Sequence, residues 1–373
     1  MQNIAIFIDD YSLLGGAQKV TYNLSQLFYD NNIPIKAIFT RTNSKSMNYP
    51  YPKGVEIIEF GDNIQLVIDY INNNKIGNLI VQIENLKNCY ELIEHLDYLN
   101  IKFHNILHSS PNQWFRKYYD FNQYITNPKL ILQWFKMICY WRPLHRKLFN
   151  KLISKHGLIC VGKQSAKEMQ IIMRGRFNHN IDYIYNPLVF PSFELDYSHK
   201  ENILLYCGRI SPEKRPITML KVWKLIYSKV PNWKFILLGD GPELNKVKKF
   251  IADNNLYNIE VKGQVNDVDS YMRLSKISIL LSKYEGLPTG LLEAIYYGNA
   301  IIGSISDGGI HDIVHENKNG SIVAPNDIDE ISSQLLALME DDALCKSKCL
   351  ESRKHFNKFS QNIIINKWLS HLI

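Results

Sequence analysis

Short apolar runs rich in β-branched residues alternate with segments of helical periodicity along this chain, and the alternation occurs as two successive series. This pattern is typical of parallel sheets, whose strands are buried on both faces and are joined by crossover helices. Residues 17–30 have the spacing of a helix with Val20, Leu24, Leu27 and Phe28 on one face. The first series predicts strands at Ile4–Ile8, Ile35–Phe39, Val55–Ile58, Leu79–Ile83, Ile101–Leu107, Leu158–Val161 and Ile181–Tyr185.

The second series begins after a polar stretch that contains Pro187 and Pro191. It predicts strands at Ile203–Cys207, Lys234–Leu238, Ile259–Val261, Ile277–Leu281, Ala300–Gly303 and Ser321–Val323. We divide the 373 residues into an N-terminal α/β domain (1–186), a linker (187–202), a C-terminal α/β domain (203–355) and a helix (356–373) that we expect to pack back toward the first domain. Open parallel sheets bind ligands beyond the carboxyl ends of their strands, so both domains are expected to face a central cleft.

Glycine-containing loops follow the first predicted strand of each series. Gly15-Gly16 opens the first helix, where glycine lets a ligand approach the backbone and the helix N-terminus favours an anion; an ordinary turn is the alternative. In the second series, Arg209 and Lys214 stand between a strand and a helix that begins near Pro216. A guanidinium binds phosphate through two hydrogen bonds and an ammonium binds it as a point charge, so this pair suits a diphosphate. Another glycine-rich turn, at 239–241, is expected only to shape the cleft.

The most informative motif places two glutamates seven residues apart, in Tyr284-Glu285-Gly286-Leu287-Pro288-Thr289-Gly290-Leu291-Leu292-Glu293-Ala294. Gly286 and Pro288 exclude a helix through its first part, and Thr289 is expected to be the N-cap of a helix that Gly298 stops. Glu285 would then lie in the loop and Glu293 early in the helix.

The free N–H groups around Thr289–Leu291 would form an electropositive helix end that favours a phosphate. Glu285 and Glu293 would flank this phosphate, one binding the hydroxyls of a sugar and the other the hydroxyls of a ribose.

Positive charge is concentrated in residues 101–182, which contain fourteen Lys and Arg but three Asp and Glu, in a chain of net charge +7. The stretch also contains Trp114, Phe115, Tyr118, Tyr119, Phe121, Tyr124, Trp134, Phe135, Tyr140 and Trp141. Basic residues interleaved with Trp and Tyr suit an anionic membrane surface better than a nucleic acid, which we do not expect as a partner. A solvated basic face with the aromatic residues in the core is the alternative.

No run approaches 18 apolar residues, and the N-terminus lacks the basic segment of a signal peptide. We therefore expect a cytoplasmic protein, held peripherally at the inner face of the cytoplasmic membrane. Cys345 and Cys349 stand four residues apart without a histidine nearby, and Asp267-Val268-Asp269 falls in a polar connection. We expect neither a metal site nor a cofactor.

Residues 203–325 resemble the donor-binding half of the group 1 (family 4) retaining glycosyltransferases, a family that includes sucrose synthases and bacterial cell-surface sugar transferases. The resemblance rests on the Gly-Arg…Lys sequence at 208–214 and on the Glu-x7-Glu motif at 285–293. Gly15-Gly16 and His108 match further marks of the family, and the resemblance is weakest over residues 110–157. Arg215 stands where the family often has glycine, and Asp312 where glutamate is commoner.

The resemblance implies a GT-B fold, that is, an α/β protein with two Rossmann-like domains facing a central cleft. It implies that Arg209 and Lys214 stabilise the departing diphosphate, that Glu285 contacts the transferred sugar and that Glu293 binds the nucleotide ribose. His108 would lie near the reaction centre. The implied catalytic residues are His108, Arg209, Lys214 and Glu285. The implied donor-binding residues are Gly15, Gly16, Arg209, Lys214, Glu285, Gly286, Leu287, Thr289, Gly290, Leu291 and Glu293.

The implied reaction is metal-independent transfer of a hexose or N-acetylhexosamine from a nucleotide-sugar, with a UDP-sugar expected, and with retention of anomeric configuration. The implied acceptor is a glycan or lipid-linked acceptor in lipopolysaccharide, O-antigen or capsule biosynthesis. A nucleotide-sugar epimerase or a phosphorylase of the same fold is an alternative, but it would need different site residues, such as a cofactor-bearing lysine. A nonenzymatic nucleotide or glycan binder is another, although binding alone would not need two carboxylates, two cations and a histidine.

Overall fold

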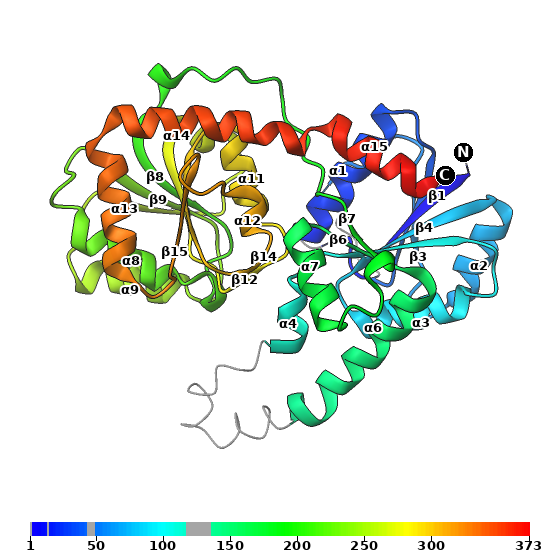
Figure 1. Ribbon diagram of the computed structural model, residues 1–373. Helices are drawn as coiled ribbons and strands as arrows, with labels where there is room; N and C mark the ends of the chain where they lie inside the picture. The colour runs from blue at the N-terminus through cyan, green and yellow to red at the C-terminus, as the bar shows by residue number, and fades with distance from the viewer. Residues whose placement is uncertain (1, 13–14, 43–48, 117–135) are drawn as a thin grey trace. The chain divides into compact units, whose positions relative to one another are not determined.

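The structure, a computed structural model, describes residues 2–12, 15–42, 49–116 and 136–373. The chain divides into two compact units (Figure 1). Unit 1 comprises residues 1–189 and 359–373, and unit 2 comprises residues 190–358. Each unit contains its own parallel sheet, which confirms the expected α/β class with two sheets.

Unit 1 has seven parallel strands in the order β3-β2-β1-β4-β5-β6-β7. The strands are β1 (Asn3–Ile8), β2 (Ile35–Thr40), β3 (Glu56–Glu59), β4 (Ile76–Ile83), β5 (Lys102–Leu107), β6 (Leu158–Cys160) and β7 (Ile181–Tyr183). The helices are α1 (Gly16–Asp30), α2 (Ile64–Asn73), α3 (Leu86–Leu96), α4 (Pro111–Arg116), α6 (Arg142–His156), α7 (Lys163–Ile172) and α15 (Gln361–Leu372), with a π-helical turn at Met137–Trp141 before α6.

The strand order of unit 1 reverses between β1 and β4. The chain builds the sheet outward from β1 through β2 to β3, and then crosses back to add β4 to β7 on the other side. Loops from the two neighbouring strands therefore diverge at their carboxyl ends, which is where such sheets bind ligands. On one face of this sheet α1 contacts α15, where the Phe28 and Trp368 ring centroids lie 5.5 Å apart.

Unit 2 repeats the arrangement with six parallel strands in the order β10-β9-β8-β11-β13-β15. The strands are β8 (Glu201–Cys207), β9 (Lys234–Leu238), β10 (Ile259–Gly263), β11 (Ser275–Leu280), β13 (Ala300–Ser304) and β15 (Gly320–Val323), with a separate short pair of β12 (Tyr284–Glu285) and β14 (Asp307–Gly308). The helices are α8 (Pro216–Ile226), α9 (Leu244–Asp253), α10 (Val268–Leu274), α11 (Thr289–Tyr296), α12 (Ile310–Ile313), α13 (Ile328–Glu340) and α14 (Asp342–His355). Here the order reverses between β8 and β11.

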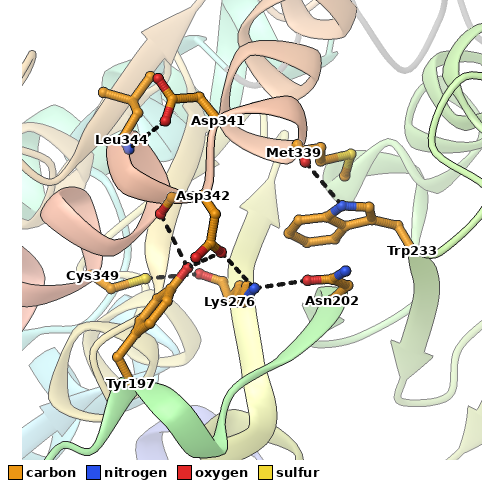
Figure 2. A network of polar contacts seen from close by, with 9 residues as sticks. All are labelled: Tyr197, Asn202, Trp233, Lys276, Met339, Asp341, Asp342, Leu344 and Cys349. Atoms are coloured by element: carbon orange, nitrogen blue, oxygen red, sulfur yellow. Dashed lines mark hydrogen bonds and ion pairs between the residues drawn. The ribbon is translucent and has the colours of Figure 1, made fainter.

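Residues 190–202, expected to be a linker, belong to unit 2 because their aromatic side chains pack on it. The Phe190 ring stacks on Tyr296 with centroids 4.0 Å apart. Figure 2 shows a second attachment, where the Tyr197 hydroxyl donates to Asp342 Oδ1 at 2.7 Å. Lys276 Nζ donates to the same oxygen at 2.7 Å and to Asn202 Oδ1 at 2.8 Å. This network joins β11 to the start of α14 at the amino end of the strand.

Candidate active site

The predicted donor-binding residues of unit 2 gather around the carboxyl ends of β8 and β11, at the point where the strand order reverses. Arg209 and Lys214 lie in the loop between β8 and α8. Glu285 lies five residues after the end of β11. The sheet topology therefore brings together two motifs that are more than 70 residues apart in the sequence.

Lys214 and Glu285 form a direct ion pair. Lys214 Nζ donates to Glu285 Oε1, and the two side chains are 20% and 12% exposed. The Ser282 hydroxyl donates to the same carboxylate oxygen at 2.6 Å. Because both groups are largely shielded from water, their attraction is stronger than that of a surface pair. The pair couples the proposed phosphate cation directly to the proposed sugar-binding carboxylate.

Arg209 is exposed, in contrast to Lys214. Its carbonyl oxygen accepts a hydrogen bond of 2.7 Å from the hydroxyl of buried Tyr206, which fixes the backbone beneath the guanidinium. Burial acts to raise the pKa of the Glu213 carboxyl, but hydrogen bonds and the charges of Lys214 and Arg209 outweigh burial and lower it. Both cations therefore act on the Glu213 carboxylate, which lies in the same loop.

Glycine-rich turns support both parts of this site. A Cβ on Gly239 would come within 2.0 Å of the Gly208 carbonyl oxygen, and a Cβ on Gly241 within 2.3 Å of the Ile210 carbonyl oxygen. The turn after β9 therefore buttresses the Arg209 loop, which agrees with a purely structural role for it. Gly308 has φ of 94°, and a Cβ there would lie 1.6 Å from the Glu285 carbonyl oxygen.

The start of α11 differs from the prediction in two respects. Pro288, and not Thr289, occupies the N-cap position, and Thr289 is the first helical residue. The reason is that Pro288 adopts the extended backbone of a cap, with φ −69° and ψ 93°, while its fixed φ suits the entry to a helix. Glu285 lies in the two-residue strand β12 and not in an irregular loop, because β12 pairs with β14.

The N–H groups at this helix start are only partly free. Leu291 N–H donates to the Pro288 carbonyl oxygen at 3.0 Å, so it is not available in the way we predicted. Gly290 lies against β8, where a Cβ would be 3.0 Å from the Cys207 carbonyl oxygen. Leu287 is buried at 5% exposure and Glu293 at 6%, so the side chain of Leu287 serves the core and the Glu293 carboxylate lies deeper than that of Glu285.

Gly15 and Gly16 open α1 after β1 in unit 1, as expected. Gly15 is the N-cap, with φ of −138°, which any residue adopts. A Cβ on Gly16 would meet nothing within 4 Å. A Cβ on Gly15 would lie 2.4 Å from Gln18 Oε1, so glycine there leaves room for the buried Gln18 side chain, whereas Gly16 is open. The predicted contact of the two glycines with a diphosphate stays a prediction.

His108 directly follows β5, and its ring is fixed by β4. Its Nε2 donates to Gln82 Oε1, which can only accept, so Nδ1 is left as an acceptor. Burial lowers the pKa of His108 to about 4, and the imidazole is therefore neutral near pH 7. A neutral ring with a fixed tautomer suits a hydrogen-bonding role toward a sugar.

Glu84 was not found from the sequence, although it directly follows β4 at the reversal point of unit 1. Gln18 Nε2 donates to Glu84 Oε1 at 3.0 Å and to the Asp10 carbonyl oxygen at 2.7 Å. Burial, with smaller contributions from the Asp9 and Asp10 charges, raises the pKa of Glu84 to about 7. The sequence signal that could have found Glu84 is a polar residue immediately after a predicted strand. Asp9 and His108 carry the same signal, so it does not single out Glu84.

Part of the basic, aromatic stretch lies outside the described residues, including Tyr118, Tyr119, Phe121, Tyr124, Trp134 and Phe135. Within the described part, Phe115 is buried beside Phe149, whereas Tyr140 is 56% exposed. None of the described helices combines the length and apolarity of a membrane span. Asp267, in the Asp-x-Asp sequence, accepts from Ser270 N–H at 3.0 Å and caps α10.

Unit 2 carries a cationic loop beside the end of its central strand β8. Two parallel Rossmann-like sheets, one in each unit, are the arrangement of the GT-B fold, and the solved structures agree. The chain resembles TarM of S. aureus in complex with Fondaparinux, alpha-GlcNAc-glycerol and UDP, with a TM-score of 0.78 at 15% identity over 100% of this chain and 99% of that one. It resembles Anabaena HepE in complex with UDP with a TM-score of 0.71 at 14% identity over 100% and 99%.

The family described as Glycosyl transferases group 1 matches residues 192–362. The matched segment covers most of unit 2 and includes Arg209, Lys214, Glu285 and Glu293.

Two curated relatives illustrate the similarity. One is the alpha-1,4-N-acetyl-D-galactosaminyltransferase of Campylobacter jejuni named for GalNAc-alpha-(1->4)-GalNAc-alpha-(1->3)-diNAcBac-PP-undecaprenol, 27% identical over 52% of this chain and 55% of that protein. The other is the amylovoran biosynthesis glycosyltransferase AmsD of Erwinia amylovora, 23% identical over 99% of both. The chain spans about half of the Campylobacter relative and about a third of two further relatives, at 35% and 33%.

Proposed function

We propose that this chain is a retaining glycosyltransferase that transfers a hexose or N-acetylhexosamine from a UDP-sugar to a glycan or lipid-linked acceptor of cell-surface polysaccharide biosynthesis. The observation that carries the proposal is the Lys214–Glu285 pair beside Arg209 at the strand-order reversal of unit 2. Relatives that act on undecaprenol-linked glycan and in amylovoran biosynthesis, and similar structures that hold UDP, support the donor and acceptor classes.

In this proposal the diphosphate lies against Arg209 and Lys214. Negative charge grows on the leaving phosphate as the bond to the sugar breaks, and fixed cations stabilise this charge more in the transition state than in the ground state. Glu285 binds hydroxyls of the transferred sugar, and its negative charge is neutralised by the ion pair with Lys214. Glu293 binds the ribose, and the leaving phosphate accepts the proton of the acceptor hydroxyl on the same face of the sugar.

We assign acceptor binding to unit 1, at the ends of β1 and β4. The pKa of Glu84 is near neutrality, so its carboxyl group can accept a hydrogen bond from a sugar hydroxyl or donate one to it. Gln18 orients the Glu84 carboxyl group. His108 contributes a neutral imidazole whose free Nδ1 is an acceptor. No metal or cofactor is part of this proposal, because the two cations supply the positive charge that the leaving group needs.

The proposed location is the inner face of the cytoplasmic membrane, held peripherally by residues 101–182. The support is the net charge of that stretch, with fourteen basic and three acidic residues, and the exposure of Tyr140. Tyrosine at the headgroup level and cations near an anionic surface both favour such binding.

Incubation with a panel of UDP-, GDP- and ADP-sugars tests the reaction class. A glycosyltransferase releases the nucleoside diphosphate slowly to water and faster when acceptor glycans are added. An epimerase converts the donor sugar without releasing nucleotide, a phosphorylase releases product only with inorganic phosphate, and a binder leaves every donor intact. Any of the last three outcomes would overturn the proposal.

A further inference from the structure

A small hollow lies between α6 and the end of α7 in unit 1, away from the strand ends that form the candidate site. Its volume is about 60 Å³. Three of the six side chains that line it are arginines; the lining consists of Arg146, Asn150, Ile172, Met173, Arg174 and Arg176. None of these residues carries a role in the proposed transfer reaction.

The backbone at the end of α7 presents two of these arginines. Arg174 and Gly175 adopt left-handed conformations, with φ of 54° and 69°. Gly175 N–H donates to the Gln170 carbonyl oxygen and Arg174 N–H to that of Ile171, both at 2.9 Å. These bonds close the helix end, and the chain turns so that Arg174 and Arg176 flank Gly175.

The third arginine reaches the hollow from α6. Arg146 Nη2 donates to the Ile172 carbonyl oxygen at 3.4 Å, so its guanidinium is anchored on the last turn of α7. Capping a helix C-terminus is an ordinary use of arginine, and it explains Arg146 by itself. It does not explain Arg174 and Arg176, whose side chains follow the helix end and are exposed.

The hollow carries an excess of positive charge that the described part of the chain does not neutralise. Among the described residues, no ion pair involves Arg146, Arg174 or Arg176, and no carboxylate lines the hollow. Residues 142–176 contain nine Lys and Arg but one acidic residue, Glu168. Arginine stays protonated at all relevant pH values, so the repulsion among three guanidinium groups is relieved only by an anion or by water.

The chemistry of the hollow selects the anion. Guanidinium groups bind phosphate through paired hydrogen bonds, and three of them line this hollow. The hollow is small, so most of a larger ligand lies outside it. Next to the lining residues in sequence, Ile171 is 74% exposed, and Lys147, which follows Arg146 on α6, is also exposed. An exposed isoleucine beside cations fits the boundary between headgroups and acyl chains better than a soluble polyanion.

We propose that the hollow formed by Arg146, Arg174 and Arg176 binds the headgroup phosphate of an anionic membrane lipid. The site refines the membrane association proposed above and rests on it. The phosphate accepts hydrogen bonds from the three guanidinium groups, and Ile171 enters the interface beside it. The lipid thereby fixes the orientation of unit 1 at the membrane surface, which a diffuse basic surface alone would not do.

Co-sedimentation with phosphatidylglycerol vesicles at low salt tests the proposal, using two double variants of equal charge loss in the same helix region. Arg174→Gln with Arg176→Gln removes two of the three guanidinium groups that line the hollow, whereas Lys163→Gln with Lys167→Gln removes two exposed cations of α7 that do not line it. Each binding curve is repeated with inorganic phosphate and with chloride at equal ionic strength, to separate phosphate recognition from screening.

We expect the arginine variant to lose about 10-fold or more in vesicle affinity and to respond equally to the two salts. The lysine variant should lose less vesicle affinity, and phosphate should still compete with its vesicle binding more strongly than chloride does at equal ionic strength. Equal behaviour of the two variants would show diffuse attraction and overturn the proposal. So would a wild-type protein that binds inorganic phosphate in calorimetry but ignores the vesicles.

Release of nucleoside diphosphate from a soluble UDP-sugar should be unchanged in both variants, since neither touches the donor residues. This control separates the two proposals: lost vesicle binding with normal turnover concerns the lipid site alone, and absent turnover in the wild type concerns the transferase function alone.

Discussion

Arg209 and Lys214 carry the same charge but lie in different surroundings, so their removal should have different consequences. We expect each alanine variant to slow transfer roughly 10²–10³-fold, the usual effect of losing one group that stabilises a leaving charge. Only Lys214→Ala should also lower stability, by about 1–3 kcal/mol, because it leaves the Glu285 carboxylate largely buried without its cation. Steady-state kinetics and denaturant unfolding of the same preparations measure both effects.

Lys246→Ala is the matched control for stability. It removes a lysine from an ion pair with Glu243 in the same unit, but that lysine side chain is 64% exposed. Its loss should cost between 0 and about 1 kcal/mol and leave turnover unchanged. Equal stability losses for Lys214→Ala and Lys246→Ala would contradict the shielded pair.

The Glu84 carboxyl gives unit 1 a pH-dependent stability. Its pKa is raised from 4.5 to about 7 in the folded state, so the unfolded chain loses the proton first as the pH rises. The folded state then binds more protons between these values, and the free energy of unfolding falls with rising pH across that window. Glu84→Gln should remove this fall and gain at most about 3 kcal/mol over the wild type by pH 8.

Urea unfolding of the wild type and of Glu84→Gln at several pH values measures the difference. Below pH 4.5 the two proteins should differ little, because Glu84 is protonated in both states. A stability difference that stays constant from pH 4 to pH 8 would show that the Glu84 pKa is not raised.

At the scale of elements, the short β12–β14 pair positions Glu285. This strand pair needs glycine at position 308 for two reasons. Gly308 has φ of 94°, which other residues rarely adopt, and an added Cβ would lie 1.6 Å from the Glu285 carbonyl oxygen. Gly308→Ala should therefore displace Glu285 and lower kcat/KM for the donor by about 10-fold or more. Gly263→Ala separates the two causes, because Gly263 has φ of 70° but nothing within 4 Å of the added Cβ. It should cost about 1 kcal/mol of stability and leave donor kinetics unchanged.

The thirteen strands of the two sheets could be predicted from sequence because buried parallel strands are continuous apolar runs bounded by polar turns. β12 and β14 could not, since two-residue strands carry no periodicity. They exist because the Gly308-Gly309 turn fits tightly against Glu285 and Gly286, a contact between distant segments. The N-cap of α11 was mispredicted for a different reason. Threonine is a preferred N-cap residue, but Pro288 has the backbone conformation of the cap, and Thr289 is the first residue of the helix.

The sequence nominates the candidate donor-site residues, but it does not predict their pairing. Lys214 and Glu285 are 71 residues apart, and only the neighbouring positions of β8 and β11 bring them into contact. Glu84 was missed for a related reason, because its raised pKa depends on the residues that bury it. A carboxylate after a strand has no special appearance until Gln18 and the Asp9-Asp10 segment are placed around it.

Considered as a whole molecule, the chain uses one architecture twice, with a parallel sheet and one strand-order reversal in each unit.

We expect the transferase activity to survive excess EDTA, because Arg209 and Lys214 supply the positive charge for the departing diphosphate. Assays of donor turnover with and without chelator check this. Complete loss of activity on chelation, restored by added Mn²⁺ or Mg²⁺, would mean that the two cations are insufficient.

The central claim is that unit 2 binds a nucleoside diphosphate through Arg209 and Lys214. Titration calorimetry with UDP, GDP and ADP, supported by thermal shift, tests it without knowledge of the sugar or the acceptor. We predict that the wild type binds UDP most tightly, that the Arg209→Ala, Lys214→Ala double variant weakens UDP binding by at least about 10-fold, and that a Lys248→Ala, Lys249→Ala control on the exposed face of α9 binds as the wild type does. Equal UDP affinity in the wild type and the Arg209, Lys214 variant, or no binding of any of the three nucleotides, would contradict the account.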